Sequence, residues 1–287
     1  MQTSTGNYVA WGFASKNCQM GGYGGHQVLG FRNLDDLSAR MAPYTFRATR
    51  DVLELPDAQH VDVPVRLPDD AMRVYRDVRD ELVADLASGV LTVSNSLARL
   101  LRLAQVASGY LPAIGADGHP DRDGRVERLH TEKRDALREL LESCDPGEPW
   151  VAFCRFHHDL DQVAEAARLA GRPSMELSGR RKELGDWREA CRAGRGPVLA
   201  AQIQSGGIGI SLVEAAFCAY VSVGYSLAEF QQSLARIHGP EQERPVAYYH
   251  IVARGTVDVD IRRALDRRAD VLGFVAAELV RAKENAA

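Results

Sequence analysis

The feature that most constrains the fold is an alternation of short apolar segments with helical patterns over the second half of the chain. Apolar segments typical of buried strands occur at 150–156, 174–177, 197–203, 218–224 and 246–252. Helices are predicted around them at 132–144, 158–170, 180–193, 211–217 and 227–237, and a last helix runs from Thr256 into the tail. Short apolar strands separated by helices predict an α/β fold with a mostly parallel sheet covered on both faces.

The preceding part of the chain is organised differently. Residues 1–34 are rich in glycine and show no periodicity, so residues 1–58 are predicted to form an irregular connector. Residues 59–67 alternate apolar and polar side chains as a half-buried strand does, and two amphipathic helical patterns follow. We therefore predict a mostly helical linker over 59–130 and the α/β domain over 131–287.

Composition and charge exclude several classes of protein. With 287 residues, 45% of them hydrophobic, and a net charge of −4, the chain is globular and is not a basic nucleic-acid coat protein. Its five cysteines are widely spaced and form no C-x-x-C pair, so neither a metal site nor a disulfide framework is predicted. No signal peptide opens the chain and no apolar run reaches about 20 residues, which predicts a cytoplasmic protein without a membrane partner.

A glycine-rich segment, "QSGGIGISL", follows the strand predicted at 197–203. Ligands of parallel sheets bind beyond the carboxyl ends of the strands, and glycines let the backbone approach a phosphate closely. A tight strand-to-helix turn explains the same glycines. A dinucleotide fingerprint fits poorly, because the glycine spacing differs from G-x-G-x-x-G and the next strand, "CAYVSVG", ends without an acidic residue.

The next motif, "QQSLARIHGPEQERPV" at 231–246, decides between these interpretations. Gln232, Arg236, His238 and Gln242 stand in register with the pattern Q-x-x-G-R-x-H-R-x-G-Q, and "RPV" follows. This pattern resembles the sixth motif of Swi/Snf-like helicases and translocases of superfamily two. The preceding "SGGIGISL" resembles the fifth motif of that family, "AGGxGxNL", and the spacing between the two motifs also fits.

The resemblance extends over most of the chain. "WVAFCRFHHDLDQV" resembles the fourth motif of the family, and "LSGR" at 177–180 resembles the loop that follows it. "TFRATRDVLELPD" at 45–57 resembles the stretch that connects the two motor lobes, and "VARGTVDVDI" resembles the segment beyond the sixth motif. The details are most similar to phage-type members. The resemblance implies a RecA-like C-terminal lobe, located in the host cytoplasm if the gene is phage-encoded.

The resemblance also implies roles for particular residues. Arg236 would reach the γ-phosphate of ATP across a cleft between lobes, as an arginine finger, with Gln232 supporting it as the second catalytic residue. The residues implied in nucleotide binding are Gly207, Gly209, Ser211 and Arg236. The residues implied in contacts with the nucleic-acid backbone are Arg155, Ser178, Gly179, Ser205 and Gly206. The sequence departs from the family pattern in two places, because Ser211 replaces an asparagine and Gly239 replaces the second arginine.

The chain lacks the parts of a motor that hold the β- and γ-phosphates. No lysine follows a glycine, so a P-loop is absent, and no D-E-x-H string forms an acidic box for magnesium. The resemblance therefore implies the second lobe of an ATP-dependent DNA helicase, acting with a separately encoded P-loop lobe that would hold the magnesium of the ATP. The isolated chain is expected to hydrolyse no ATP. The alternatives are an inactive remnant that binds DNA or a partner and, third, a dinucleotide-binding enzyme.

Several of these residues also have simpler interpretations. Arg155 at a strand end can form an ordinary salt bridge, His238 can be a surface histidine, and Trp187 is explained by core packing. His157 and Asp161 have the spacing of a helical metal pair, but two such side chains alone do not make a metal site, and a solvated helix start is favoured.

Overall fold

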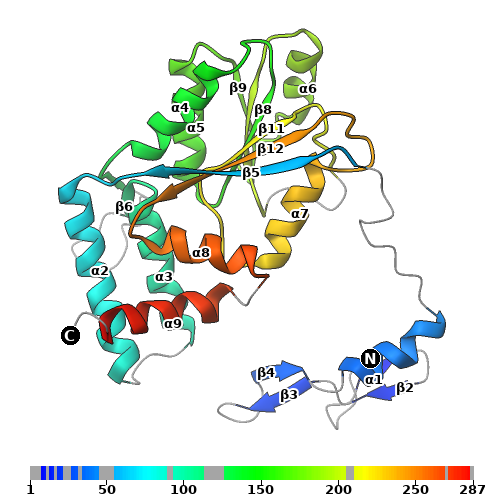
Figure 1. Cartoon of the computed structure of the whole chain (residues 1–287), viewed down its shortest axis with the longest axis vertical. Helices are drawn as coiled ribbons and strands as arrows, with labels where there is room; N and C mark the ends of the chain where they lie inside the picture. Colours follow the sequence, from blue (N-terminus) through cyan, green and yellow to red (C-terminus); the bar gives the residue numbers. More distant parts are fainter. Residues whose placement is uncertain are drawn as a thin grey trace. The chain divides into compact units, whose positions relative to one another are not determined.

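A computed structural model describes residues 8–10, 13–15, 18–21, 27–31, 34–44, 55–88, 93–112, 126–204, 210–268 and 271–284 (Figure 1). The chain divides into two compact units, Met1–Glu54 and Leu55–Ala287. In the first unit, two antiparallel hairpins precede a helix and a short 3-10 turn. They are β1 (Tyr8–Ala10) with β2 (Phe13–Ser15), β3 (Cys18–Gly21) with β4 (Gln27–Phe31), α1 (Leu34–Met41) and η2 (Ala42–Tyr44). The sequence analysis found no element here, since strands this short carry no measurable alternation.

The second unit is built on a six-stranded parallel sheet with the order β5-β12-β11-β8-β10-β9. Its strands are β5 (Ala58–Val65), β8 (Trp150–Cys154), β9 (Ser174–Leu177), β10 (Val198–Gln202), β11 (Phe217–Tyr220) and β12 (Val246–Ala253). The predicted α/β fold with a parallel sheet is confirmed. The strand predicted at 59–67 is β5, which lies at one edge of this sheet beside β12.

Eight helices and a small antiparallel hairpin complete the described part of the second unit. The helices are α2 (Asp69–Ser88), α3 (Val93–Ala107), α4 (Glu132–Ser143), α5 (His157–Leu169), α6 (Leu184–Arg192), α7 (Leu227–Ile237), α8 (Val257–Asp266) and α9 (Val271–Glu284). The hairpin pairs β6 (Tyr110–Pro112) with β7 (Val126–Arg128). The compact unit thus begins at Leu55, and the division into a connector, a helical linker and a domain beginning at residue 131 stays a prediction.

Two predicted helices were wrong. Residues 211–216 form loop and turn in place of a helix, because their backbone hydrogen-bonds to neighbouring elements. Leu212 N–H, for example, donates to the carbonyl of Arg236 at 2.7 Å. The predicted single helix from Thr256 into the tail is two helices, α8 and α9. Arg268, just beyond the end of α8, has a φ of 52°, a left-handed conformation that ends a helix.

Alternating residues of the strands explain the two covered faces of the sheet. In β8, Trp150, Ala152 and Cys154 pack with Leu137 of α4 and Val163 of α5. The side chains between them, Val151 and Phe153, pack instead with Trp187 of α6, Phe230 of α7 and Ile261 of α8. Figure 1 shows α4 and α5 on one side of these strands and α6 on the other. The predicted core positions of Trp187, Cys154 and Cys218 are confirmed by their burial.

Buried Arg172 holds the amino-terminal edge of the sheet together. Its guanidinium donates to six backbone carbonyls, those of Leu141 (2.8 Å), Cys144 (3.2 Å), Asp145 (2.8 Å), Pro146 (3.4 Å), Glu148 (2.7 Å) and Gly196 (3.3 Å). Gly196 has a φ of 54°, and a Cβ there would lie 1.9 Å from the Pro146 oxygen, so only glycine allows this close approach. Among the described helices, none combines the length and the apolar character that crossing a membrane requires.

We expect Arg172→Met to lower the free energy of unfolding by about 3 kcal/mol or more, because several buried carbonyls lose their donor at once. The matched control is Arg168→Met, on the exposed surface near the end of α5, which should change stability by about 0.5 kcal/mol or less. Urea denaturation of the two variants measures both values. Equal effects of the two substitutions would contradict the structural role assigned to Arg172.

Candidate nucleotide and nucleic-acid sites

The parallel register brings the ends of the central strands to one edge. Trp150 of β8 lies beside Val198 of β10 and Phe217 of β11, so all three strands run in step toward their carboxyl ends. Polar residues follow beyond these ends, and the sequence analysis named one of them, Arg155. They are Arg155 after β8, Gln204 shortly after β10 and Ser222 shortly after β11.

Arg155 is fixed at this edge by its backbone and its side chain. Its N–H donates to Ser222 Oγ at 2.8 Å, and its carbonyl accepts from Gln202 Nε2 at 3.2 Å. Its guanidinium Nη1 lies 3.6 Å from Glu229 Oε2, in the first turn of α7. The salt bridge that sequence analysis allowed for Arg155 is therefore present. Glu229 and Gln204 were not singled out from sequence, although Gln204 follows shortly after β10 and Glu229 lies in the first turn of the helix after β11.

Ser178 and Gly179 lie at the end of β9, with β10 between them and Arg155. Ser178 is buried and closes a tight turn: its hydroxyl donates to Glu176 and accepts from the N–H of Arg180 at 2.9 Å. Arg180 is held by Asp161 at 2.8 Å and by Glu176 at 3.1 Å. Gly179 is exposed, so it is the backbone of this turn, not the serine hydroxyl, that faces solvent.

The segments that resemble the fifth and sixth motifs meet at the end of α7. Ser211 Oγ donates to Glu241 Oε2 at 3.3 Å, and the Ser211 carbonyl accepts from Arg188 at 2.7 Å. Gln242 is buried and structural. Its Nε2 donates to the carbonyls of Val213 (3.2 Å), Ala215 (3.1 Å) and Ile237 (3.1 Å). These contacts place Ser211 beside the helix that carries Arg236 and Gln232.

Arg236 is only 6% exposed, and Gln232, one turn earlier on α7, is exposed. Burial lowers the pKa of Arg236, and the neighbouring Tyr220 opposes that shift. His238 Nε2 lies 2.8 Å from the Pro56 carbonyl, so this histidine contacts the segment that enters β5. Gly239 begins a turn in which its carbonyl accepts from Gln242 N–H at 3.0 Å.

Four of the predicted contact residues, Ser205, Gly206, Gly207 and Gly209, lie outside the described residues. Their roles in phosphate and nucleotide binding stay predictions. Across the part of the chain that the structure describes, no group of three or more histidine, cysteine or acidic side chains could hold a metal ion.

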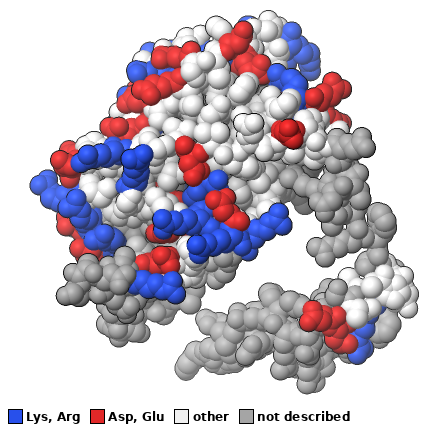
Figure 2. Space-filling model, in the orientation of Figure 1, with Lys and Arg blue, Asp and Glu red and all other residues white. Residues whose placement is uncertain are grey.

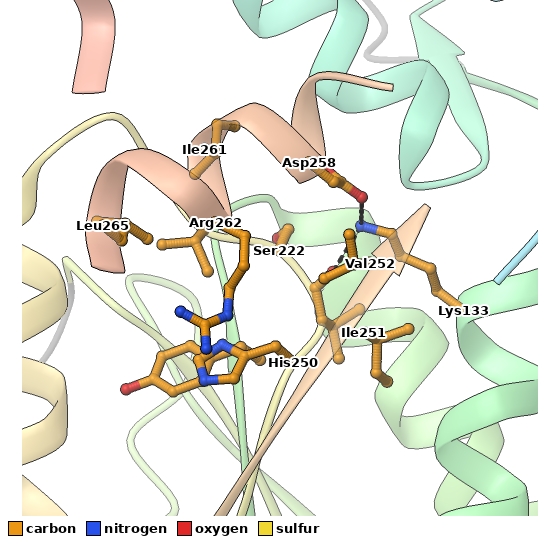
Figure 3. Close-up of a pocket in the computed structure, with 12 residues that line it drawn as sticks. Lys133, Ser222, His250, Ile251, Val252, Asp258, Ile261, Arg262 and Leu265 are labelled. Atoms are coloured by element: carbon orange, nitrogen blue, oxygen red, sulfur yellow. Dashed lines mark hydrogen bonds and ion pairs between the residues drawn. The ribbon is translucent and has the colours of Figure 1, made fainter. Parts of the chain in front are cut away.

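A crevice of about 30 Å³ lies at the carboxyl ends of β11 and β12, beneath α8 (Figure 3). A space of that size admits one water molecule and excludes a nucleotide. Lys133, 1% exposed, crosses it: its Nζ lies 2.7 Å from Asp258 Oδ2 and donates to the Val221 carbonyl at 2.8 Å. His250 lines the same crevice, and burial together with nearby Arg262 lowers its pKa to about 2. The ion pair ties α4 to α8 and serves packing.

Asp159 is a completely buried carboxyl group in the first turn of α5. It accepts from the hydroxyl of Ser222 and from the N–H of Phe156 at 3.3 Å. Burial raises its pKa from 3.8 to about 6, against the opposing effects of Ser222 and Lys133. Asp159 and Ser222 thus link the start of α5 to the end of β11. Ser222 also accepts from the N–H of Arg155.

No protein-family model matches the chain. It is 24% identical over 235 residues to an uncharacterized ATP-dependent helicase of Mycoplasma pneumoniae, covering 77% of this chain and 21% of that protein. A second such helicase, of Mycoplasma genitalium, is 21% identical over 248 residues, covering 82% of this chain and 23% of the relative. The chain therefore spans about a fifth of the length of these curated relatives.

Solved structures share the fold. The C-terminal part of the Fun30 ATPase domain matches with a TM-score of 0.61 and 14% identity, covering 81% of this chain and 99% of that one. The SWI2/SNF2 ATPase core of Sulfolobus solfataricus in complex with dsDNA matches with a TM-score of 0.55 and 20% identity, covering 81% of this chain and 50% of that one. The fold is thus that of the C-terminal lobe of Swi2/Snf2 ATPase domains.

The raised pKa of Asp159 predicts a specific dependence of stability on pH. Because the folded state keeps its proton up to about pH 6, the stability from this group is full below about pH 3.8 and is lost as the pH rises through 6. Between pH 4.5 and 7 the free energy of unfolding of the parent should fall by about 2 kcal/mol relative to Asp159→Asn. Urea denaturation at the two pH values checks this, and parallel pH profiles would refute it.

Proposed function

We propose that the chain is the second motor lobe of an ATP-dependent DNA helicase or translocase of the Swi2/Snf2 type. The observation that carries the proposal is the junction of the two motif segments, where Leu212 N–H donates to the Arg236 carbonyl at 2.7 Å on this fold. In such a motor, the lobe would act with a P-loop lobe that these 287 residues do not contain. We also propose that the chain is related to the phage-type members of this group.

The nucleotide-facing residues of this lobe would supply one wall of an ATP site. Gly207, Gly209 and Ser211 would approach the nucleotide, Gln232 is already exposed, and Arg236 would provide the arginine finger. With Arg236 only 6% exposed, its guanidinium must emerge when the P-loop lobe docks. The residues present do not fit a complete site for ATP and magnesium, since the P-loop is absent from the sequence and the described residues include no metal-binding group.

Contacts with nucleic acid would lie along the carboxyl edge of the sheet. The proposed groups are Arg155, the backbone of Ser178 and Gly179, and Ser205 and Gly206. Such groups contact phosphates and not base edges, so binding would be independent of sequence. Figure 2 shows basic side chains gathered over α8, which follows β12; α8 and the turn after it carry Arg262, Arg263, Arg267 and Arg268. The same stretch carries three aspartates, Asp258, Asp260 and Asp266, which leave the four arginines an excess of one positive charge.

A binding remnant without catalysis is the second candidate. Gly239 in place of the second arginine and the burial of Arg236 favour it. A dinucleotide-binding enzyme has little support, because the glycine spacing differs from G-x-G-x-x-G and "CAYVSVG" ends without an acidic residue.

The proposal predicts weak, sequence-independent binding of duplex DNA that falls steeply with salt, because each phosphate contact releases counterions. Fluorescence anisotropy with two unrelated labelled duplexes, at about 50 and 200 mM salt, measures this. Arg155→Ala should weaken binding to both duplexes equally. Tight, salt-insensitive binding that prefers one duplex would contradict a backbone-tracking lobe.

A second test addresses the arginine finger. The 287-residue chain alone should show no DNA-stimulated ATPase. In a complex with a P-loop lobe, Arg236→Ala should lower kcat about 10³-fold or more. Gly239→Arg should raise kcat in the complex and have no effect on the chain alone; a Cβ at Gly239 would lie 3.3 Å from the Ala235 carbonyl oxygen, a tight contact that requires a small shift of the backbone. Parental turnover by the Arg236→Ala complex would favour the binding remnant.

A further inference from the structure

Glu229 contacts Arg155 and Gln204, two side chains at the carboxyl edge of the sheet that could donate to a phosphate. It stands in the first turn of α7, where its N–H donates to the cap residue Ser226 at 3.3 Å. One carboxylate oxygen lies 3.6 Å from Arg155 Nη1, and the other accepts from Gln204 Nε2 at 3.1 Å. A single carboxylate thus bridges the polar groups that follow β8 and β10.

This arrangement resembles a bound anion more than a structural salt bridge. The side chains of Arg155 and Glu229 are 21% and 32% exposed, so the pair is open to solvent and to a ligand. A carboxylate and a phosphate accept from the same donors, a guanidinium and an amide N–H. A phosphate that approaches Arg155 meets the like charge of Glu229, so it binds more tightly once that carboxylate has moved away.

The guanidinium has little freedom to move to a phosphate elsewhere. A Cβ at Gly224 would lie 3.0 Å from Arg155 Nη1 and 3.3 Å from its Cδ, so the arginine lies against this backbone. The Arg155 main chain is held on both sides, by Ser222 Oγ at 2.8 Å and by Gln202 Nε2 at 3.2 Å. The side chain that can leave is Glu229, whose carboxylate contacts two exchangeable donors, Arg155 at 3.6 Å and Gln204 at 3.1 Å.

We propose that Glu229 is an internal competitor for backbone phosphate, which keeps Arg155 and Gln204 occupied until nucleic acid replaces its carboxylate. This inference rests on the proposed function of the same edge. Its consequence is a lobe that grips the backbone weakly and releases it readily, as a protein that steps along DNA requires. The competitor sets affinity and does not choose sequence, because phosphates are identical along the strand.

The test is a double-mutant cycle on the whole chain with a labelled duplex of about 20 base pairs, sized to exceed one lobe's contacts. Glu229→Gln keeps the size and the helix position and removes the charge. It should raise affinity about threefold to fivefold at low salt, the upper part of the range expected when one partly exposed ion pair no longer competes. In an Arg155→Ala background the same substitution should change affinity by less than about twofold.

Two controls separate this effect from a general gain of positive charge. Glu189→Gln removes one charge from the exposed surface of α6 and should leave affinity almost unchanged. Gly224→Ala should disturb Arg155 and lower affinity while Glu229 is intact. Thermal unfolding of each variant verifies that it is folded before binding is measured.

The outcomes are distinct. Suppose that the parent binds DNA in a salt-dependent way. If Glu229→Gln then leaves affinity unchanged, or raises it equally with and without Arg155, the competitor role of Glu229 is overturned and the proposed function stands. Binding by neither the parent nor Glu229→Gln overturns both. Binding that appears or strengthens with Glu229→Gln, and only when Arg155 is present, supports the inference.

Discussion

The parallel pairing of β8 with β10 on one side and β11 on the other is the constraint on which the rest of the structure depends. In-step parallel strands must all end at the same edge, so the side chains that follow them are gathered there whatever their distance in sequence. That register places Arg155 against the end of β11, where Ser222 accepts its N–H, and brings Gln204 and Glu229 within reach of one another. The packed core beneath the strands makes the arrangement rigid.

The two edges of the sheet use arginine in opposite ways. At the amino-terminal edge, the buried guanidinium of Arg172 donates hydrogen bonds to backbone carbonyls of three segments. No ligand can replace this set of contacts. At the carboxyl edge, Arg155 makes one ion pair at 3.6 Å with a partly exposed acid, which an anion can exchange. Contacts that stabilise the fold therefore lie at one end of these strands, and the proposed binding groups lie at the other.

The buried ion pair of Lys133 and Asp258 extends the rigid part to α8. Lys133 joins the start of α4, the end of β11 and the start of α8, because its ammonium contacts both Asp258 and the Val221 carbonyl. Replacing only one member would leave a buried charge without its partner, which is far more costly than losing an exposed pair. The helix that adjoins the basic surface in Figure 2 is thus held firmly on the core.

Local pattern predicted most of the sheet, since strands such as Trp150–Cys154 are continuous apolar runs bounded by polar residues. The boundaries of α7 also follow from local chemistry, because Ser226 caps its start and Gly239 and Pro240 follow its end. The helix expected at 211–217 failed for the opposite reason: Leu212 and Ser211 bond to α7 and α6, and no local pattern shows such partners.

The sequence identified only those candidate site residues that stand within a recognisable motif. Arg236 and Gln232 were proposed because they match a motif pattern, and Ser211 because it stands where that pattern has an asparagine; the structure joins their segments, and their roles stay predictions. The burial of Arg236 could not be read from that pattern, since it depends on packing near Tyr220. The roles of Lys133, Arg172 and Glu229 could not be predicted from the sequence, because their partners lie on segments distant along the chain.

Photo-crosslinking to duplex DNA tests the central claim most directly, that nucleic acid runs along the carboxyl edge of the sheet. A photoreactive amino acid is placed at His157, an exposed position just beyond β8, or at Arg195, an exposed position just before β10 at the opposite edge. The account predicts a crosslink from position 157 that added salt suppresses, and little or none from position 195. Equal crosslinking from both positions, or a preference for 195, would contradict it.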